Sequence, residues 1–187
     1  MFKRLMGILV AALLAMPVSA WADSCTDTAN LFRKAGQSAD FFKGAYGYAV
    51  FPTIGKGGIG VGGAFGKGCV YAKGKHVGDT SMTQLSIGFQ LGGQGFSEII
   101  FFQDERSFRE FTGGNFEFGA DAQAVAITLA AQAGASSTGA SAGASATKHD
   151  AATAGAYYKG MATFTIIKGG LMYEAAVKGQ KFSYKSR

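Results

Sequence analysis

The chain has few of the residues from which metal sites are usually built. Among its 187 residues there are two cysteines and two histidines, Cys25, Cys69, His76 and His149. Their spacing matches no common zinc motif, and we expect both histidines to lie at the surface. The sequence therefore predicts no metal site and no cofactor.

The two cysteines can still pair with each other. In an oxidising compartment outside the cytosol, such a pair can form a disulfide. A bridge between Cys25 and Cys69 would stabilise the fold by about 4 kcal/mol in the chain-entropy model. The spacing alone leaves open whether the two side chains meet.

The chain also lacks an apolar run that is long enough to cross a membrane as a helix. The apolar segment at residues 5–16 has twelve residues, whereas a spanning helix needs about 20. Two basic residues precede it, and small residues around Ala22 fit a cleavage site, which is typical of a signal peptide. We therefore expect residues 1–22 to be removed and residues 23–187 to form one exported domain, in the periplasm or elsewhere in the cell envelope.

Charged residues are scarce, at 16% of the chain, and the net charge of +6 at pH 7 is a modest excess. We expect no nucleic-acid partner. The basic residues are mostly lysines near expected strand ends and turns, such as Lys56 and Lys67. Anionic lipid headgroups suit such a rim of lysines, because each contributes about 1 kcal/mol near a charged membrane. The same lysines also fit an ordinary solvated surface.

Glycine, in contrast, is abundant: there are 29, and eight of them lie in residues 55–68. The G-x-G-x-x-G match at 58–63 leads into further strand-like sequence, whereas a dinucleotide site needs a helix at that point. A G-x-S-x-G match at 139–143 lies in a Gly/Ala/Ser tract, 134–147, which we expect to be a flexible loop. Because neither match has the context that its chemistry requires, we predict no catalytic residues and no enzymatic activity.

Apolar spacing predicts both helices and strands. Residues 24–43 carry apolar side chains at helical spacing, and residues 104–114 form a second helical segment with Asp104 as its N-cap. Most other apolar residues alternate with small or polar ones. This period of two is typical of strands.

The glycines decide the shape that we expect for the sheet. Ile59, Val61 and Phe65 alternate with glycine and alanine, so residues 55–68 fit a strand rather than a phosphate-binding loop. Glycine inside a strand permits bulges, sharp coiling and close approach of another layer. We predict an α+β fold with a strongly curved, antiparallel, glycine-rich and barrel-like sheet, interrupted by turns near Gly74 and 92–93, and two or three short helices.

Four segments resemble the SYLF (Ysc84-type) domain and follow one another in the order of that family. They read YGYAVFPTIGKGGIGVGGAFGKGCVY, LSIGFQLGGQGFSEIIFF, FREFTGGNFEFGADA and YYKGMATFTIIKGGLMYEAAV. The resemblance implies a compact, β-rich, non-enzymatic module that binds lipids. Eukaryotic members bind phosphoinositides, and some bind actin.

The resemblance also implies that an N-terminal amphipathic helix with basic residues makes the lipid contact. The corresponding segment here is 24–43. With the two lysines of the rim, the predicted lipid-binding residues are Phe32, Arg33, Lys34, Phe41, Phe42, Lys43, Lys56 and Lys67. For an exported protein the expected partner is an anionic phospholipid or membrane surface of the bacterial envelope. The alternative is a structural or interaction domain that binds another envelope protein through its sheet edge or glycine-rich face.

Overall fold

The computed structural model describes residues 18–118, 124–127 and 157–187 of the chain. The expected flexible loop at 134–147 and most of the expected signal peptide lie outside the described residues. The elements, in chain order, are α2 (Val18–Lys34), α3 (Gly36–Ala39), α4 (Phe41–Gly44), β1 (Gly47–Ala72), β2 (Lys75–Phe102), α5 (Glu105–Thr112), β3 (Asn115–Phe118), β4 (Ala124–Ile127) and β5 (Met161–Ser186).

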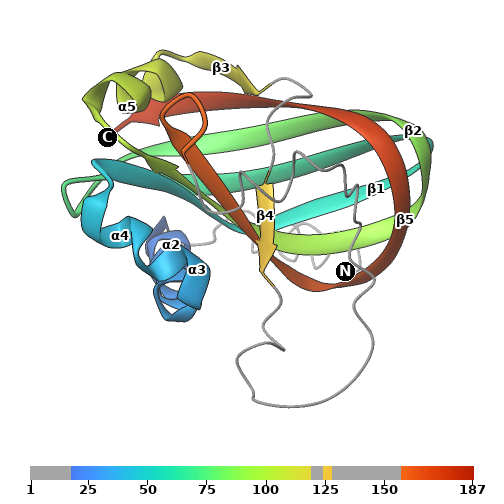
Figure 1. The fold of residues 1–187 in the computed structure, drawn as a ribbon, viewed down its shortest axis with the longest axis horizontal. Helices are drawn as coiled ribbons and strands as arrows, with labels where there is room; N and C mark the ends of the chain where they lie inside the picture. Colours follow the sequence, from blue (N-terminus) through green and yellow to red (C-terminus); the bar gives the residue numbers. More distant parts are fainter. Residues whose placement is uncertain (1–17, 119–123, 128–156) are drawn as a thin grey trace, which may run out of the picture.

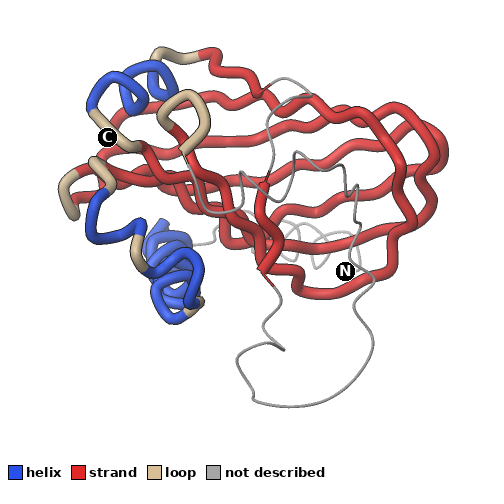
Figure 2. Tube along the Cα trace, in the orientation of Figure 1, coloured by secondary structure: helices blue, strands red, loops and turns tan. Residues whose placement is uncertain are grey.

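The sheet is mostly antiparallel and curls into a half-barrel (Figures 1 and 2). Its strand order is β1-β2-β5-β3, and the short β4 pairs in parallel with β5. β1 and β2 form one long hairpin whose turn contains Lys73 and Gly74, both with positive φ. The curled sheet and the short helices confirm the predicted α+β class.

β1 and β2 are longer than the sequence indicates. We expected glycines to divide this region into several strands, with a turn at 92–93, yet β1 runs for 26 residues and β2 for 28. Instead of ending the strands, the irregular positions shift the β1–β2 register, once between Ile59 and Val61, where Gly60 has a φ of 71°. Such a bulge bends a strand while the ladder continues on both sides.

Glycine also lets β1 fold over itself. A Cβ atom added to Gly68 would lie 2.5 Å from the carbonyl oxygen of Val50 and 2.8 Å from the ring of Phe51. A Cβ atom on Gly66 would lie 2.5 Å from Cγ1 of Ile54. The glycine-rich run is therefore curved sheet, and at Gly66 and Gly68 the first part of the same strand occupies the space that a side chain would need.

The sheet separates two apolar clusters. The inner cluster fills the concave side and includes Phe51, Met82 and Phe182, with Phe111 of α5 packed among them. The outer cluster lies on the opposite face, under α2, α3 and α4. Its buried members are Cys25, Phe32, Ala35, Val50, Cys69, Ile99, Phe101, Ala162, Phe164 and Ile166.

Candidate functional site

The predicted lipid-binding residues on the N-terminal helices do not share one exposed face. Phe32 is completely buried in the outer cluster. The expectation that this side chain inserts into lipid is therefore wrong for this fold, because its ring is part of the core. Helical spacing placed Phe32 on an apolar face but gave no information about what covers that face.

Phe41 and Phe42 are half-buried over the same cluster. The ring of Phe41 lies 4.9 Å from that of Phe164, and the ring of Phe42 lies 4.8 Å from that of Phe101. The guanidinium of Arg33 lies 4.5 Å from the centre of the Phe42 ring, in a cation–π contact. These contacts hold the helices on the sheet and use much of the surface that lipid insertion would need.

Lys34 and Lys43 are exposed on this side of the molecule. Lys43 Nζ lies 2.9 Å from Asp40 Oδ1, which offsets its charge. Lys34 lines a groove of about 720 Å³ between α2 and β5, and Lys168 lines it too, with its Nζ 3.1 Å from Thr53 Oγ1. The remaining lining residues are Ser24, Asp27, Thr28, Asn30 and Leu31. The groove is polar and only weakly basic.

The two lysines predicted on β1 point to opposite faces. Lys67 is exposed on the outer face, whereas Lys56 is only 8% exposed. Lys56 therefore does not belong to a basic rim, because its position in the alternation turns it inward with Ile54. Of the pair, only Lys67 is available to a membrane.

Polar side chains lie among the inward-facing residues as well. Glu98 is 1% exposed, and Gln180 Nε2 donates to Glu98 Oε2 and to Gln84 Oε1 at 3.3 Å each. Burial raises the pKa of Glu98 to about 7, although the hydrogen bond from Gln180 lowers it in part. This carboxyl group was not anticipated from the sequence.

An uncovered apolar surface lies on the outer face of the hairpin. We call it the outer apolar strip, and its members are Ile59, Val61 and Phe65 of β1 with Leu85 and Leu91 of β2. All five side chains are more than half exposed, and Ile59 reaches 80%. In the ladder Ile59 pairs with Leu91, and Leu85 pairs with Gly63, which lies between Val61 and Phe65.

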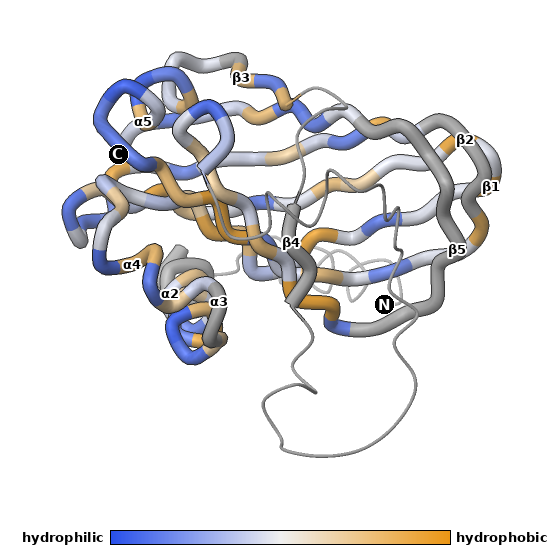
Figure 3. The backbone as a smooth tube through the Cα atoms, viewed as in Figure 1, coloured by the Kyte–Doolittle hydropathy of each residue, from blue (hydrophilic) through white to orange (hydrophobic). Residues whose placement is uncertain are grey.

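The outer apolar strip occupies the middle of the two strands, where the half-barrel turns back on itself. Figure 3 shows hydrophobic segments of β1 and β2 at this end, away from α2, α3 and α4. Alternation in the sequence correctly indicated that Ile59, Val61 and Phe65 share a face. It could not indicate that the helices cover a different part of that face.

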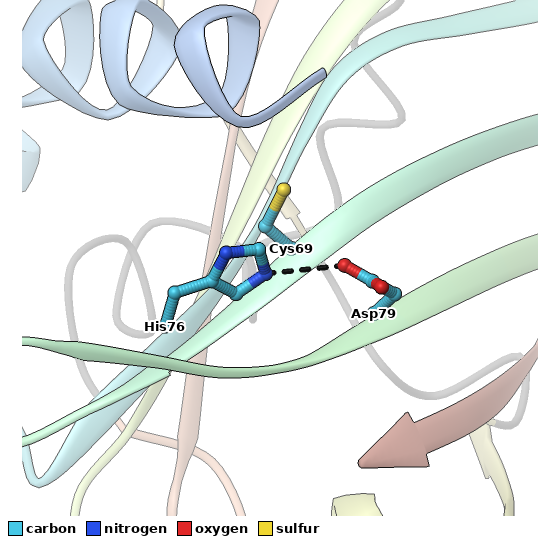
Figure 4. Close-up of side chains that lie close together, drawn as sticks. All are labelled: Cys69, His76 and Asp79. Carbon is cyan, nitrogen blue, oxygen red and sulfur yellow. Dashed lines mark hydrogen bonds and ion pairs between the residues drawn. The ribbon is translucent and has the colours of Figure 1, made fainter. Parts of the chain in front are cut away.

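A compact group of potential ligand atoms lies where α2 meets the hairpin (Figure 4). The structure joins Cys25 to Cys69 by a disulfide, with the two Cα atoms 6.2 Å apart. One ligand atom each from Cys69, His76 and Asp79 lies within 4.8 Å of the others. His76 Nε2 is 3.1 Å from Asp79 Oδ1, and Arg187 Nε is 3.3 Å from Asp79 Oδ2.

Sequence spacing predicts no metal site, and the fold nevertheless brings these three side chains together. Cys69 pairs directly with Asp79 across the hairpin, and Tyr71 pairs with His76. The turn at the end of the hairpin, not a sequence motif, brings these side chains together. The side chain of His76 is 16% exposed, so it is also more enclosed than a surface residue.

These features define an α+β domain that is built on a strongly curled antiparallel half-barrel with a helical cover on part of its outer face. Over residues 83–186 the chain matches the family described as "Ysc84: Las17-binding protein actin regulator". Because the match covers more than half of the 187 residues, the chain belongs to the Ysc84 family, as the resemblance predicted. No curated protein and no solved structure matches the chain.

The family match begins within β2 and ends within β5. It therefore includes Leu85 and Leu91 but not the N-terminal helices on which Arg33, Lys34 and Lys43 lie. Each helix that the structure describes is too short or too polar to span a membrane.

Proposed function

We propose that this protein is a lipid-binding module that attaches to the surface of a membrane through the outer apolar strip. The observation that carries the proposal is the exposure of five large apolar side chains on two paired strands. Scattered apolar residues are normal on protein surfaces, but a contiguous group marks an interaction site. Membership of the Ysc84 family is consistent with this function.

Burial of the strip in the acyl-chain boundary would supply most of the binding free energy. Removing apolar surface from water contributes about 25 cal/mol per Å². Gly63, which lies between Val61 and Phe65 on the same face, has no side chain, so its larger neighbours project beyond the backbone. This geometry suits shallow insertion rather than a deep anchor.

Lys67 gives the proposal its preference for anionic phospholipids. It lies two residues after Phe65 on the same face of β1 and is exposed. A lysine near an anionic surface adds about 1 kcal/mol, and salt screens this contribution. For an exported protein, as the N-terminal sequence predicts, the membrane would belong to the bacterial envelope.

Vesicle flotation tests the proposal. The purified protein is mixed with neutral or anionic phospholipid vesicles at low and high salt, and the floated fraction is measured. We expect flotation with both vesicle types, with more protein on the anionic ones and a loss of that excess in high salt. A double variant, Ile59→Ser with Leu91→Ser, should lose at least about tenfold in affinity, because two exposed members leave the strip.

The matched control is Leu31→Ser, since Leu31 is an exposed apolar residue of α2, 42% exposed and outside the strip. A second comparison replaces Arg33, Lys34 and Lys43 by glutamine. If this triple variant loses binding while the strip variant floats normally, the helical surface is the lipid site and the strip is not. If the wild-type protein floats neither with neutral nor with anionic vesicles, the proposal fails. The outer apolar strip would then be expected to bind a protein partner.

A further inference from the structure

We propose that the protein binds one Zn²⁺ ion when the Cys25–Cys69 disulfide is reduced. The ligands are the thiolates of Cys25 and Cys69, the imidazole Nε2 of His76 and the carboxylate oxygen Oδ1 of Asp79. This site is separate from the outer apolar strip, and it stands whether or not the lipid-binding proposal holds.

The potential ligand atoms lie close to the spacing that a tetrahedral zinc ion needs. Zinc binds sulfur at about 2.3 Å and nitrogen or oxygen at about 2.0–2.2 Å, which places ligand atoms roughly 3.3–3.8 Å apart. His76 Nε2 and Asp79 Oδ1 are already 3.1 Å apart, and the sulfur of Cys69 lies within 4.8 Å of both residues' ligand atoms. Cys25 Sγ is bonded to that sulfur at 2.01 Å, so reduction leaves a fourth ligand at the same place.

The surroundings orient these ligands before any metal arrives. Arg187 Nε lies 3.3 Å from Asp79 Oδ2 and leaves Oδ1 to face His76. The ring of His76 stacks on the ring of Tyr71, with centroids 5.0 Å apart. Zinc sites in proteins use such outer contacts to fix the orientation of their ligands. The guanidinium of Arg187 also balances charge, because two thiolates and one carboxylate around Zn²⁺ leave one negative charge.

The structure, which holds the disulfide, represents the state that does not bind metal. A dithiol reductant converts the Cys25–Cys69 bridge to two thiols by giving two electrons and two protons, while the reductant itself closes to a cyclic disulfide. On binding Zn²⁺, each thiol releases its proton to the solvent, and two S–Zn bonds replace the S–S bond. His76 binds in its neutral form, and its Nε2 gives up the contact with the Gly78 carbonyl at 3.0 Å.

The oxidised protein and the reduced, zinc-bound protein both link α2 to the β1–β2 hairpin through Cys25 and Cys69. In the oxidised protein the link is covalent, and in the reduced protein it is the metal ion. Both cysteines are nearly or fully buried. To exchange one link for the other, the two sulfur atoms separate from 2.01 Å to about 3.7 Å, the distance between two sulfur ligands of one zinc ion.

Metal titration of the full-length protein tests the site. The protein is reduced with excess dithiothreitol, freed of reductant without oxygen, and titrated with Zn²⁺ against a competing chromogenic chelator. The expected result is one tightly bound zinc per chain in the reduced protein and at least about hundredfold weaker binding in the oxidised protein. Co²⁺ in place of zinc should give thiolate charge-transfer absorption and the intense d–d bands of four-coordinate cobalt.

Single-ligand variants distinguish the four-ligand site from binding by the cysteines alone. His76→Ala and Asp79→Asn should each weaken zinc binding at least tenfold and change the cobalt spectrum. The matched controls are His149→Ala and Glu117→Gln, which remove a histidine and a carboxylate from elsewhere in the chain and should leave binding unchanged. If His76→Ala and Asp79→Asn both bind zinc as tightly as the wild type, the proposed ligand set is wrong.

Circular dichroism addresses the possibility that reduction unfolds the protein. If the reduced protein loses structure and Zn²⁺ restores it, the result supports the site, since zinc binding then contributes directly to folding. If the reduced protein stays unfolded with Zn²⁺, or stays folded and binds none, the proposal is overturned.

Discussion

At the scale of single residues, Glu98 is the group with the clearest energetic consequence. Its carboxyl lies in the concave side of the half-barrel, with Gln84 and Gln180 as its polar neighbours. Burial favours the neutral form of the carboxyl, which explains a pKa of about 7 in place of 4.5. The folded protein therefore keeps a proton that the unfolded chain releases.

This difference predicts a pH-dependent stability with a definite sign. The contribution of Glu98 is fully present below about pH 4.5 and is lost as the pH rises towards 7, because only the unfolded chain gains free energy by ionising in that interval. Glu98→Gln should remove this slope and be more stable than the wild type at pH 8, by on the order of 3 kcal/mol. Urea denaturation at pH 4.5, 6 and 8 measures the effect.

Glu117→Gln is the control for that experiment, because Glu117 is exposed and pairs with Lys181 at 2.9 Å. Its stability should follow the wild-type pH profile closely. If the free energy of unfolding changes with pH in the same way for the wild type and for Glu98→Gln, the carboxyl group of Glu98 does not carry the predicted proton.

At the scale of elements, the curl of β1 depends on glycine at its inward positions. Gly68 lies against the backbone of Val50 and the ring of Phe51, whereas nothing described lies within 4 Å of a Cβ built on Gly55. Both glycines belong to the same strand, so they have similar conformational freedom in the unfolded chain. They differ in what the fold places beside them.

Gly68→Ala should therefore destabilise the protein by about 2 kcal/mol or more, because the added methyl overlaps backbone that cannot move aside. Gly55→Ala should change the stability by less than about 1 kcal/mol. Thermal unfolding of the two variants under identical conditions measures the difference. Equal effects would mean that β1 does not fold over itself as closely as described.

The sequence predicted the local features of the helices and strands better than it predicted how these elements pair and pack with one another. Asp104 was expected to cap the helix that follows, and Ser107 N does donate to its Oδ1 at 2.8 Å. This hydrogen bond joins residues three apart, so a local pattern suffices. The sequence did not predict the full length of β1, because a glycine such as Gly60 usually indicates the end of a strand. Here Gly60 lies in a bulge, and the strand continues beyond it.

Local sequence patterns could not predict the contacts between segments that are far apart in the chain. Phe32 was expected at a lipid surface, but the strands beneath it come from residues well over a dozen positions away. The approach of His76 and Asp79 to Cys69 depends on how β1 pairs with β2, and that register has shifts which the sequence does not mark. The candidate sites therefore had to be located from the fold.

At the scale of the whole molecule, a disulfide cross-links the helical cover to the sheet. The Cys25–Cys69 disulfide spans 44 residues and ties α2 to β1. Beyond this bond, the cover is held by Phe32 and by the half-buried rings of Phe41 and Phe42.

Replacing both cysteines by alanine should lower the free energy of unfolding by about 4 kcal/mol, since a loop of this length is no longer closed in the unfolded chain. Urea denaturation without reductant measures the loss. Adding a reductant and a zinc chelator together to the wild-type protein should cause the same loss in the free energy of unfolding, because neither the disulfide nor a zinc ion then links the two cysteines. A double variant as stable as the wild type would show that the aromatic contacts alone hold the helices in place.

The pairing of β2 with β5 has a consequence for the time that folding takes. Phe102 pairs with Met161, and the partners become more distant in sequence along the ladder until Gly78 meets Ser186. Closing such large loops makes folding slow, since the entropy is lost before the contacts form. Before β5 pairs with β2 during folding, one edge of β2 has unpaired backbone N–H and C=O groups, and a strand of another chain can pair with them. We expect refolding at high protein concentration to yield aggregates first, and dilution to favour the native half-barrel.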